Sequence, residues 1–260
     1  MPGSCDDSRR WDGTAARAGG YYLPPALAGH KCGEYRRLLD GWGIGPCRRA
    51  LVTDLYESSF GVNGLGEALG SLSEVVVGLD ISRVICRRAK RSLEGGGIRA
   101  KVISGDCRRI PLADECVDLI LSPSTFDHFP EIGAALAECR RVLRPGGRLV
   151  LALNSADNPL YRLGVRLAER FKRREYPTDF FYTARQARCL LAEAGFRPGR
   201  AAAIMQVPVG LTTMAEVMAG LGAPPGGLAN RLLIGVCRSL GRAGGLGRLT
   251  GWWVAVEGIK

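Results

Sequence analysis

Five short apolar runs alternate with segments of helical pattern between residues 50 and 154, and this alternation constrains the fold more than any other feature of the chain. Each run has about the length of a buried strand and is rich in leucine or β-branched residues. The runs cover residues 50–56, 74–80, 99–106, 116–122 and 148–154. In the clearest intervening helix, apolar residues at spacings of four, three and four share one face, namely Ile132, Leu136, Cys139 and Leu143.

Strands that are apolar throughout favour a parallel sheet covered on both faces, because each crossover helix packs back onto the sheet. The sequence therefore predicts an α/β protein with a doubly wound, Rossmann-like sheet. Two further strands are predicted at residues 201–207 and 251–258, after a helix over residues 183–196.

The flanking segments are predicted to cover this core. The first twenty residues (1–20) are polar and expected to be flexible, and residues 21–47 are expected to form a cap region with a short amphipathic helix after Pro25. Residues 48–260 are assigned to one domain. Within it, a helical insert over about residues 208–248 separates the last two predicted strands and suits a lid.

Charge and composition narrow the possible partners. The formal net charge is +11, but the arginines are spread out, and the basic clusters at 86–92 and 170–175 lack the interleaved aromatic side chains of a single-strand groove. No nucleic-acid partner is predicted.

The 9 cysteines form no C-x-x-C pair, so no disulfide framework and no metal site is expected. No apolar run approaches the roughly 20 residues of a membrane span, and the N-terminus does not resemble a signal peptide, so we expect a cytoplasmic protein.

Three acidic residues lie at or near the ends of successive predicted strands, and they are evenly spaced by 26 positions: Asp54, Asp80 and Asp106. Ligands of doubly wound sheets bind beyond the carboxyl ends of the strands, so these carboxylates are expected to meet at one crevice. An acid at the end of the second strand suits a ribose, because its two oxygens can accept both hydroxyl hydrogens of the diol.

Several motifs in this order carry a family resemblance: VVVGLDIS, GDCRRIPLADECVDLILSPSTFDHF, ALAECRRVLRPGGRLVLALN and LLAEAGF. Together they resemble class I S-adenosylmethionine-dependent methyltransferases of the small-molecule type, over roughly residues 48–207. The resemblance implies a seven-stranded sheet whose last strand, GWWVAVEG, is antiparallel. It also implies S-adenosylmethionine as the methyl donor, bound across the ends of the first four strands.

The resemblance assigns roles to particular residues. Asp80 would hold the ribose hydroxyls, with Ile81 in the same cofactor-binding set. Asp106 and Cys107 would face the adenine edge. The segment from Ser122 to Ser124 would line the methyl-donor end.

The first predicted strand departs from the family pattern. The family has an acid followed by three closely spaced glycines, whereas here Asp54 is followed by Tyr56 and Glu57, and the next glycine is Gly61. A side chain at a glycine position either fills the site or forces the loop outward, because Cβ needs space and restricts φ. We expect a rerouted but working loop in which these residues contact the donor and Glu57 pairs with its α-ammonium group. The alternatives are an exposed loop glutamate and an aspartate that only caps a helix.

The acceptor side is predicted from one of the chain's 2 histidines. His128 follows the fourth predicted strand, and a histidine with a pKa near neutrality suits a general base that removes the acceptor's proton. The adjacent Asp127 is a candidate to orient it. The alternative is a loop histidine that packs against Phe129.

A second group of residues is predicted to contact the substrate. The helix before the first strand often folds over the cofactor in this fold, so its aromatic and histidine side chains would shield the sulfonium: Tyr21, Tyr22, His30 and Tyr35. Asn154, after the fifth strand, is expected to bond a polar group of the acceptor. Ordinary helix packing and a turn ahead of Pro159 explain the same residues.

The sequence therefore predicts methyl transfer to a small, partly apolar molecule. Two alternatives remain: a methyltransferase-like binding or scaffolding module that has lost methyl transfer, and an enzyme that catalyses a different reaction with the same cofactor. Contact of residues 230–242 with a membrane surface is a further alternative, because that segment mixes apolar residues with arginines. The sequence determines neither the acceptor nor the oligomeric state.

Overall fold

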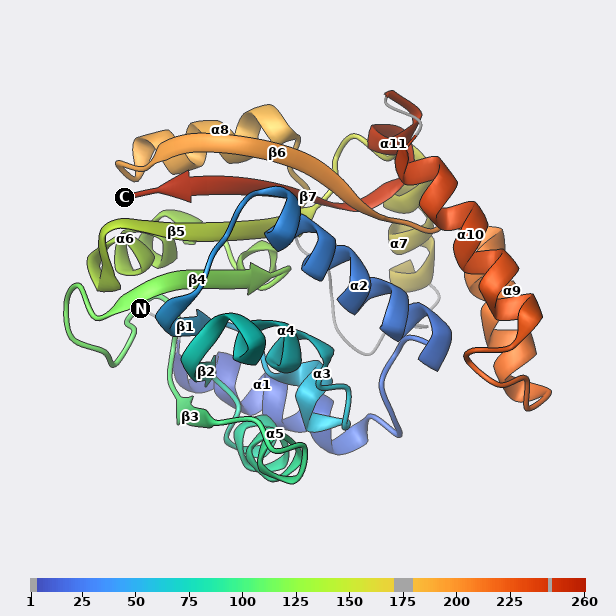
Figure 1. The fold of residues 1–260 in the computed structure, drawn as a ribbon, viewed down its shortest axis with the longest axis horizontal. Helices are drawn as coiled ribbons and strands as arrows, with labels where there is room; N and C mark the ends of the chain where they lie inside the picture. Colours follow the sequence, from blue (N-terminus) through green and yellow to red (C-terminus); the bar gives the residue numbers. More distant parts are fainter. Residues whose placement is uncertain (1–3, 171–179, 243–244) are drawn as a thin grey trace.

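The computed structural model of the chain describes residues 4–170, 180–242 and 245–260. Its centre is a seven-stranded sheet (Figure 1) formed by β1 (Cys47–Val52), β2 (Ser73–Asp80), β3 (Ala100–Ser104), β4 (Val117–Pro123), β5 (Leu143–Asn154), β6 (Arg197–Gln206) and β7 (Gly251–Ile259). The spatial order is β3-β2-β1-β4-β5-β7-β6. β1 to β5 run parallel, and β7 is antiparallel to both β5 and β6. The predicted doubly wound α/β fold with an antiparallel last strand is confirmed.

Helices cover both faces of the sheet. They are α1 (Ser4–Arg17), α2 (Pro25–Gly41), α3 (Tyr56–Ser59), α4 (Gly64–Leu72), α5 (Arg83–Gly95), α6 (Ile132–Val142), α7 (Pro159–Arg170), α8 (Ala184–Glu193), α9 (Val209–Gly220), α10 (Leu228–Arg242) and α11 (Gly245–Thr250), with a short 3₁₀ helix, η1 (Phe126–His128). Successive residues of β1 point to opposite faces of the sheet, and each face has its own hydrophobic core. Ala50 and Val52 pack with α2, α4 and α5, and Leu51 packs with α6 and α8. This two-sided burial is the reason that the strands are apolar throughout.

The chain reverses direction across the sheet between β1 and β4. It passes outward from β1 through β2 to β3, and then returns to β4 on the other side of β1. In a parallel sheet, such a switch point separates the helices that follow the two neighbouring strands, which opens a crevice at their carboxyl ends. The functional site is therefore expected beyond Val52 and Pro123.

The first strand is shorter than the sequence pattern predicts. β1 ends at Val52 rather than near Tyr56, and the one-turn helix α3 occupies the place of the glycine-rich loop. α3 ends in a turn at Gly61, whose φ of +83° is a left-handed conformation that glycine adopts without steric cost. The sequence correctly identifies a rerouted loop, but the new path is helical.

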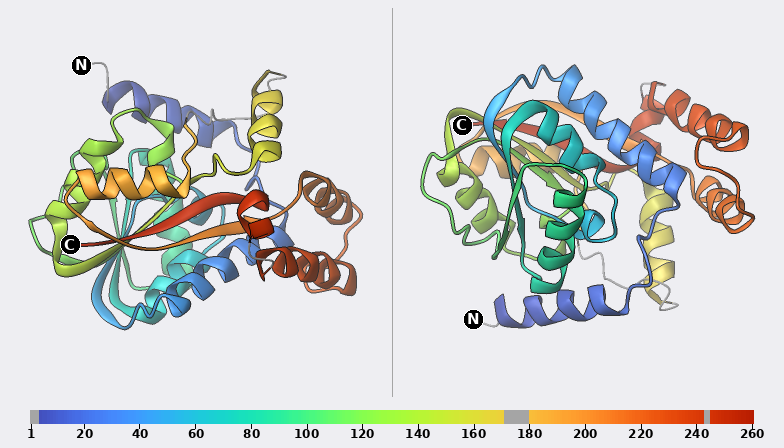
Figure 2. Two further views of the ribbon diagram at one scale, coloured as in Figure 1. Left: turned by 90° about the horizontal axis from the view of Figure 1, so that it is seen from above. Right: turned by 60° about the horizontal axis from the view of Figure 1, so that its bottom comes forward.

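The N-terminal segment also differs from the prediction, because residues 4–17 form α1 instead of a flexible terminus. α1 lies along α5 (Figure 2), and Asp12 accepts hydrogen bonds from the Ser82 hydroxyl and from the Val84 amide at 3.1 Å. The Arg88 guanidinium donates to the Ala15 carbonyl at 2.7 Å. Polar contacts rather than an apolar stripe hold this helix, which explains why its composition resembles a free terminus.

The predicted helical insert is formed by α9, α10 and α11 between β6 and β7. Figures 1 and 2 show α9 and α10 at the end of the molecule toward which the parallel strands point. Among the described residues, no helix combines the length and the apolar character that a bilayer span needs.

Gly64 gives a test of how closely the cap helix approaches the domain. A Cβ at Gly64 would overlap the Cys32 side chain of α2, whereas a Cβ at Gly70 in the same helix would meet only Ile98 Cγ2 at 3.6 Å. We expect Gly64→Ala to lower the free energy of unfolding by about 1–3 kcal/mol. Gly70→Ala should leave it unchanged or raise it by up to ~1 kcal/mol. Urea denaturation measures both, and equal losses would contradict the packing described.

Candidate functional site

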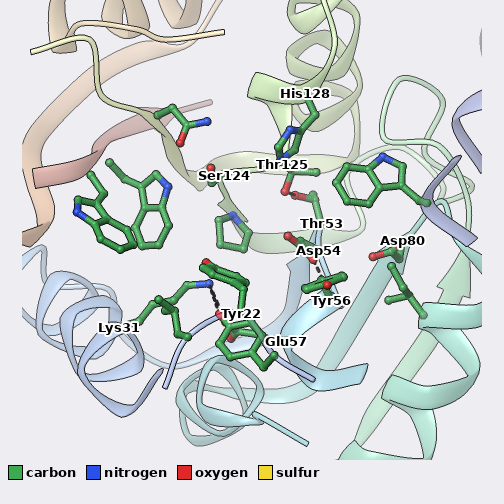
Figure 3. A pocket seen from close by; sticks show the side chains of 18 of the residues that line it. Tyr22, Lys31, Thr53, Asp54, Tyr56, Glu57, Asp80, Ser124, Thr125 and His128 are labelled. Carbon is green, nitrogen blue, oxygen red and sulfur yellow. Dashed lines mark hydrogen bonds and ion pairs between the residues drawn. The ribbon is translucent and has the colours of Figure 1, made fainter. Parts of the chain in front are cut away.

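A cavity of about 780 Å³ lies at the carboxyl ends of the central strands, at the switch point between β1 and β4 (Figure 3). Its volume is within the usual range for small-molecule sites. The predicted site residues in its wall are Tyr21, Tyr22, Asp54, Tyr56, Glu57, Asp80, Ile81, Asp106, Cys107, His128 and Asn154. The topology thus brings together most of the residues that the sequence selects.

Two half-buried carboxylates, Asp54 and Asp80, lie side by side in the cavity wall. Asp80, the last residue of β2, accepts from the Ser82 amide at 2.9 Å and from the Leu55 amide at 3.2 Å, and Asp54 accepts from the Tyr56 amide at 2.6 Å. Burial, followed by the negative charge of Asp54, raises the pKa of Asp80 to about 8, and burial likewise raises the pKa of Asp54. Each Asp80 oxygen retains acceptor capacity, because an ionised carboxylate offers about four lone-pair positions.

Asp106 is less available than the sequence suggests, because it is paired within the chain. Arg108 contacts both Asp106 oxygens and also forms ion pairs with Asp7 of α1 at 2.7 Å and Glu131 at 3.3 Å. The guanidinium also lies 5.1 Å from the Phe129 ring centroid. These contacts tie α1 to the cavity edge, where both Asp7 and Trp11 line the wall. The neighbouring Cys107 thiol is buried, and burial raises its pKa.

Glu57 has a partner that sequence analysis does not find. Its Oε2 accepts from Lys31 Nζ at 2.8 Å and from the Tyr21 hydroxyl at 3.1 Å (Figure 3), and Lys31 also donates to Tyr21 at 3.0 Å. Both charged side chains are buried. Glu57 Oε1 makes no hydrogen bond to any part of the chain that the structure describes. The alternative of an exposed loop glutamate is therefore wrong.

Aromatic rings surround the Lys31 ammonium. Its Nζ lies 5.7 Å, 6.0 Å and 5.2 Å from the ring centroids of Tyr21, Tyr22 and Trp253. Burial is the largest single influence on the pKa of Lys31 and lowers it, but Glu57 together with the neighbouring tyrosines outweighs burial, and the pKa is raised. One sequence signal could have identified Lys31. It stands four residues from both Leu27 and Tyr35, on the stripe that α2 buries.

The structure separates the two predicted catalytic residues. His128 lines the cavity, and its ring makes an edge contact with Trp11 at 5.2 Å between centroids. Asp127 is fully buried outside the wall, where it accepts from the Ser124 hydroxyl and the Asn154 amide, both at 2.8 Å. His128 Nε2 is 4.0 Å from Asp127 Oδ1, which is too far for a hydrogen bond. Asp127 joins the loop after β4 to the end of β5 and does not orient the imidazole by a hydrogen bond.

Besides Asp127, four predicted residues do not line the cavity: Gly61, Ser122, His30 and Tyr35. Gly61 forms the turn after α3, and Ser122 is fully buried within β4. His30 and Tyr35 are buried on α2, where burial lowers the pKa of His30 and raises that of Tyr35. Their position fits the packing alternative for that helix. Ser124, at the other end of the segment predicted from Ser122 to Ser124, does line the wall and has a φ of +57°, a strained conformation for a residue with a Cβ.

The far end of the cavity is aromatic, and sequence analysis misses most of it. The Tyr161 hydroxyl donates to Asn154 Oδ1 at 2.9 Å, and the Tyr161 ring stacks on Trp252 at 5.3 Å between centroids, with an interplanar angle of 12°. Trp252 Nε1 donates to the Val207 carbonyl at 2.6 Å. The inner face of α9 completes this end with Thr212, Thr213 and Glu216. These residues come from elements far apart in sequence, so no local sequence motif predicts that they meet in one wall.

The sheet order and the switch-point cavity define a class of fold: a doubly wound α/β domain with a crevice at the carboxyl ends of its central strands and an acid, Asp80, at the end of β2. The profile of the family described as Methyltransferase domain matches residues 59–151. The match begins within α3 and ends in β5.

Relatives and solved structures agree with this family. Malonyl-[acyl-carrier protein] O-methyltransferase of Methylococcus capsulatus is 37% identical over 147 residues, which cover 55% of this chain and 51% of that protein. Demethylmenaquinone methyltransferase of Thermus thermophilus is 34% identical over 76 residues, 29% of this chain and 34% of that one. A SAM-dependent methyltransferase from Aquifex aeolicus has a similar fold, with a TM-score of 0.54 and 19% identity over 76% of this chain and 92% of that chain.

The chain spans about half or less of the length of these curated relatives. The order of motifs and the matches nevertheless agree on a methyltransferase domain over residues 59–151, and the fold is the one seen in solved methyltransferase structures.

The Lys31–Glu57 pair gives a test that needs no ligand. We expect Lys31→Met and Glu57→Gln each to lower the free energy of unfolding by about 2–3 kcal/mol, because each leaves a buried charge without its partner. The double variant should lose less than the sum of the two, because neither charge then remains. Denaturant unfolding of the four proteins measures the coupling energy. Strictly additive losses would mean that the two side chains do not interact as described.

Proposed function

We propose that this protein transfers a methyl group from S-adenosylmethionine to a small, partly apolar acceptor. The observation that carries the proposal is the position of Asp80, a half-buried carboxylate at the end of β2 in the wall of the switch-point cavity. A carboxylate there can accept two hydroxyl hydrogens of a ribose. The match to the methyltransferase domain supports the same donor.

The residues at this end of the cavity fit the donor. Asp80 would hold the ribose, next to Ile81, and the segment with Asp106 and Cys107 would lie at the adenine. Glu57 Oε1 is a buried oxygen without a hydrogen-bond partner among the described residues, and it suits the α-ammonium group. When bound, S-adenosylmethionine supplies an electrophilic methyl group on a sulfonium.

The chain's own residues would align the reactants and keep water out. Trp11 and Tyr21 approach the cavity from the N-terminal segments, and Trp252 closes it from β7. Holding donor and acceptor in line removes most of the entropic barrier to a displacement between two molecules. His128, held at the wall by its contact with Trp11, would accept the acceptor's proton at an imidazole nitrogen.

The acceptor class follows from the far wall of the cavity. Tyr161 and Trp252 offer a stacked aromatic surface, and Asn154 offers an amide close to the Tyr161 hydroxyl. Such a wall suits a flat or apolar molecule with one polar group. The two relatives are named for different acceptors, malonyl-[acyl-carrier protein] and demethylmenaquinone, and their names therefore support the reaction type more than a particular acceptor.

The alternative is a binding module that keeps the fold without methyl transfer. It is favoured by Tyr56 and Ser58, which stand where the family has glycines, and by the Lys31 ammonium that already neutralises Glu57. Titration calorimetry with S-adenosylmethionine separates the two functions, because a protein without donor binding cannot transfer the methyl group.

Two variants test the site assignment. We expect Asp80→Asn to weaken S-adenosylmethionine binding by about tenfold or more, because an amide nitrogen replaces one of the two oxygens that accept from the ribose. His128→Ala is the matched control at the opposite wall and should leave donor affinity within about twofold. Calorimetry measures both affinities. Unchanged binding in Asp80→Asn would remove the assignment of the ribose site.

Turnover is tested with an extract of the source cells. Adding the protein and isotope-labelled S-adenosylmethionine, followed by mass spectrometry, identifies any compound that gains a methyl group. With that acceptor, His128→Ala should slow turnover while donor binding is kept.

The raised pKa of Asp80 predicts a pH-dependent affinity for the nucleoside. Adenosine is a suitable probe, because its own groups do not titrate near neutrality. Ribose hydroxyls bond best to the ionised carboxylate, so the affinity for adenosine should rise about tenfold from pH 6 to pH 9, through the pKa of about 8.

The stability of the unliganded protein should change with pH in the opposite direction. Because the pKa of Asp80 is higher in the folded than in the unfolded state, the free energy of unfolding should fall as pH rises from about 4 to 8.

Asp54→Asn is the control for this profile. Because it removes the neighbouring negative charge, the rise in adenosine affinity should move to lower pH. A profile that is flat in the parent protein, or unchanged in the variant, would contradict the coupling of the two carboxylates.

A further inference from the structure

The exposed apolar side chains of this protein are concentrated at one end of the molecule. Among the described residues, eleven large apolar or aromatic side chains are exposed, and ten of them fall between residues 160 and 249. The exception is Tyr22, which lines the cavity. Scattered apolar residues are normal on a protein surface, but a concentration of this kind marks an interaction site.

These side chains form stripes on three helices. The first is on α7, the second on α9 and the residue after it, and the third on α10: Leu160, Leu163 and Leu167; Met214, Val217 and Leu221; Leu228, Leu232 and Val236. Within each stripe the spacing is three or four residues, so the side chains share one face of the helix. Figures 1 and 2 show that α7, α9 and α10 gather at the same end of the molecule.

The exposed stripes belong to helices that are packed against the protein on another face. Val165 of α7, Ala215 of α9, and Leu233 and Cys237 of α10 are buried. The helices therefore have two apolar faces, of which the protein itself covers one. The described residues leave the second face uncovered.

The charge beside the stripe on α10 is positive. The sequence has no acidic residue between positions 217 and 256, whereas it has four arginines in the same stretch. Arg231, Arg238 and Arg242 of α10 and Arg248 of α11 are exposed. On α7, Arg166 is exposed between Leu163 and Leu167. Apolar side chains flanked by arginines suit a surface that is apolar beneath a negatively charged layer.

We propose that the exposed faces of α7, α9 and α10 dock this protein on the surface of an anionic phospholipid bilayer. The leucines would enter the boundary between headgroups and acyl chains, and the arginines would bond the phosphates. A second copy of the chain is a poorer partner, because a twofold interface would place the same rows of arginine against each other. An anionic bilayer would cover the exposed apolar side chains and would also pair with the excess of positive charge.

Docking has a consequence that rests on the proposed function. α7 and α9 also line the far end of the cavity, through Tyr161 and Val165 of the first and Thr212 and Glu216 of the second. The helices that contact the bilayer are thus the walls of the acceptor end. An acceptor dissolved in the lipid would have a short path into the cavity.

The experiment is co-sedimentation of the full chain with phosphatidylcholine vesicles that contain or lack phosphatidylglycerol. We expect binding to the anionic vesicles, weakened at high salt. Leu228→Asn/Leu232→Asn and Arg231→Glu/Arg242→Glu should each lower partitioning by about tenfold or more. Arg87→Glu/Arg91→Glu is the matched control, since it changes the net charge equally on the exposed side of α5, and it should keep most of the binding.

Each outcome decides the proposal. Binding that depends on α10 and not on α5 supports it. Absence of vesicle binding by a folded monomer overturns it, as does an equal loss in the α5 control, which would indicate attraction by net charge alone. A dimer in sedimentation equilibrium that dissociates in the leucine variant, without vesicle binding, would reassign the face to self-association. S-adenosylmethionine affinity, measured on the same variants, reports separately on the proposed function, because none of these residues lines the cavity.

Discussion

Two half-buried carboxylates that lie side by side at the ends of neighbouring strands set the form of the site. Asp54 and Asp80 repel each other when ionised, and burial opposes the charge of both. The amides of Leu55, Tyr56 and Ser82 offset part of this cost by donating to the two side chains. Because those amides belong to the segments that leave β1 and β2, the acids also fix the direction in which the chain enters α3 and α5. A strained, acidic crevice of this kind is typical of a binding site.

The short helix α3 is where this chain departs from the motif pattern of the methyltransferases that it resembles. Glycines normally allow the backbone to approach a cofactor, and here Tyr56 and Glu57 add side chains to the cavity wall. The cap helix α2 supplies Lys31, whose ammonium lies among three aromatic rings and pairs with Glu57. The cap and the loop are therefore one electrostatic unit. In the proposed function, the donor end of the cavity depends on α2 as much as on the sheet.

Predictions from the sequence were correct where the residue pattern within one segment is enough to predict its structure. The strands, the helix over Ile132–Val142 and the strand-end acids Asp54 and Asp80 follow from local patterns, because burial and position in a parallel sheet leave a periodic trace. It failed where polar contacts between distant segments decide the outcome. α1 is held by Asp12 and Arg88, and Asp127 turns out to bond Ser124 and Asn154 rather than His128. A hydrogen bond between residues far apart in the chain leaves no periodic pattern in the sequence.

The sequence by itself determined the class of fold, the resemblance to methyltransferases and the edge of the sheet at which a ligand would bind, because apolar periodicity and strand-end acids are local properties of the chain. Only the tertiary structure decided that Lys31 pairs with Glu57, that Tyr161 stacks on Trp252, and that three helices present apolar faces at one end. Those facts depend on which side of each element the rest of the protein covers. Burial is a property of the assembled molecule, and an apolar stripe looks the same in sequence whether the protein covers it or leaves it for a partner.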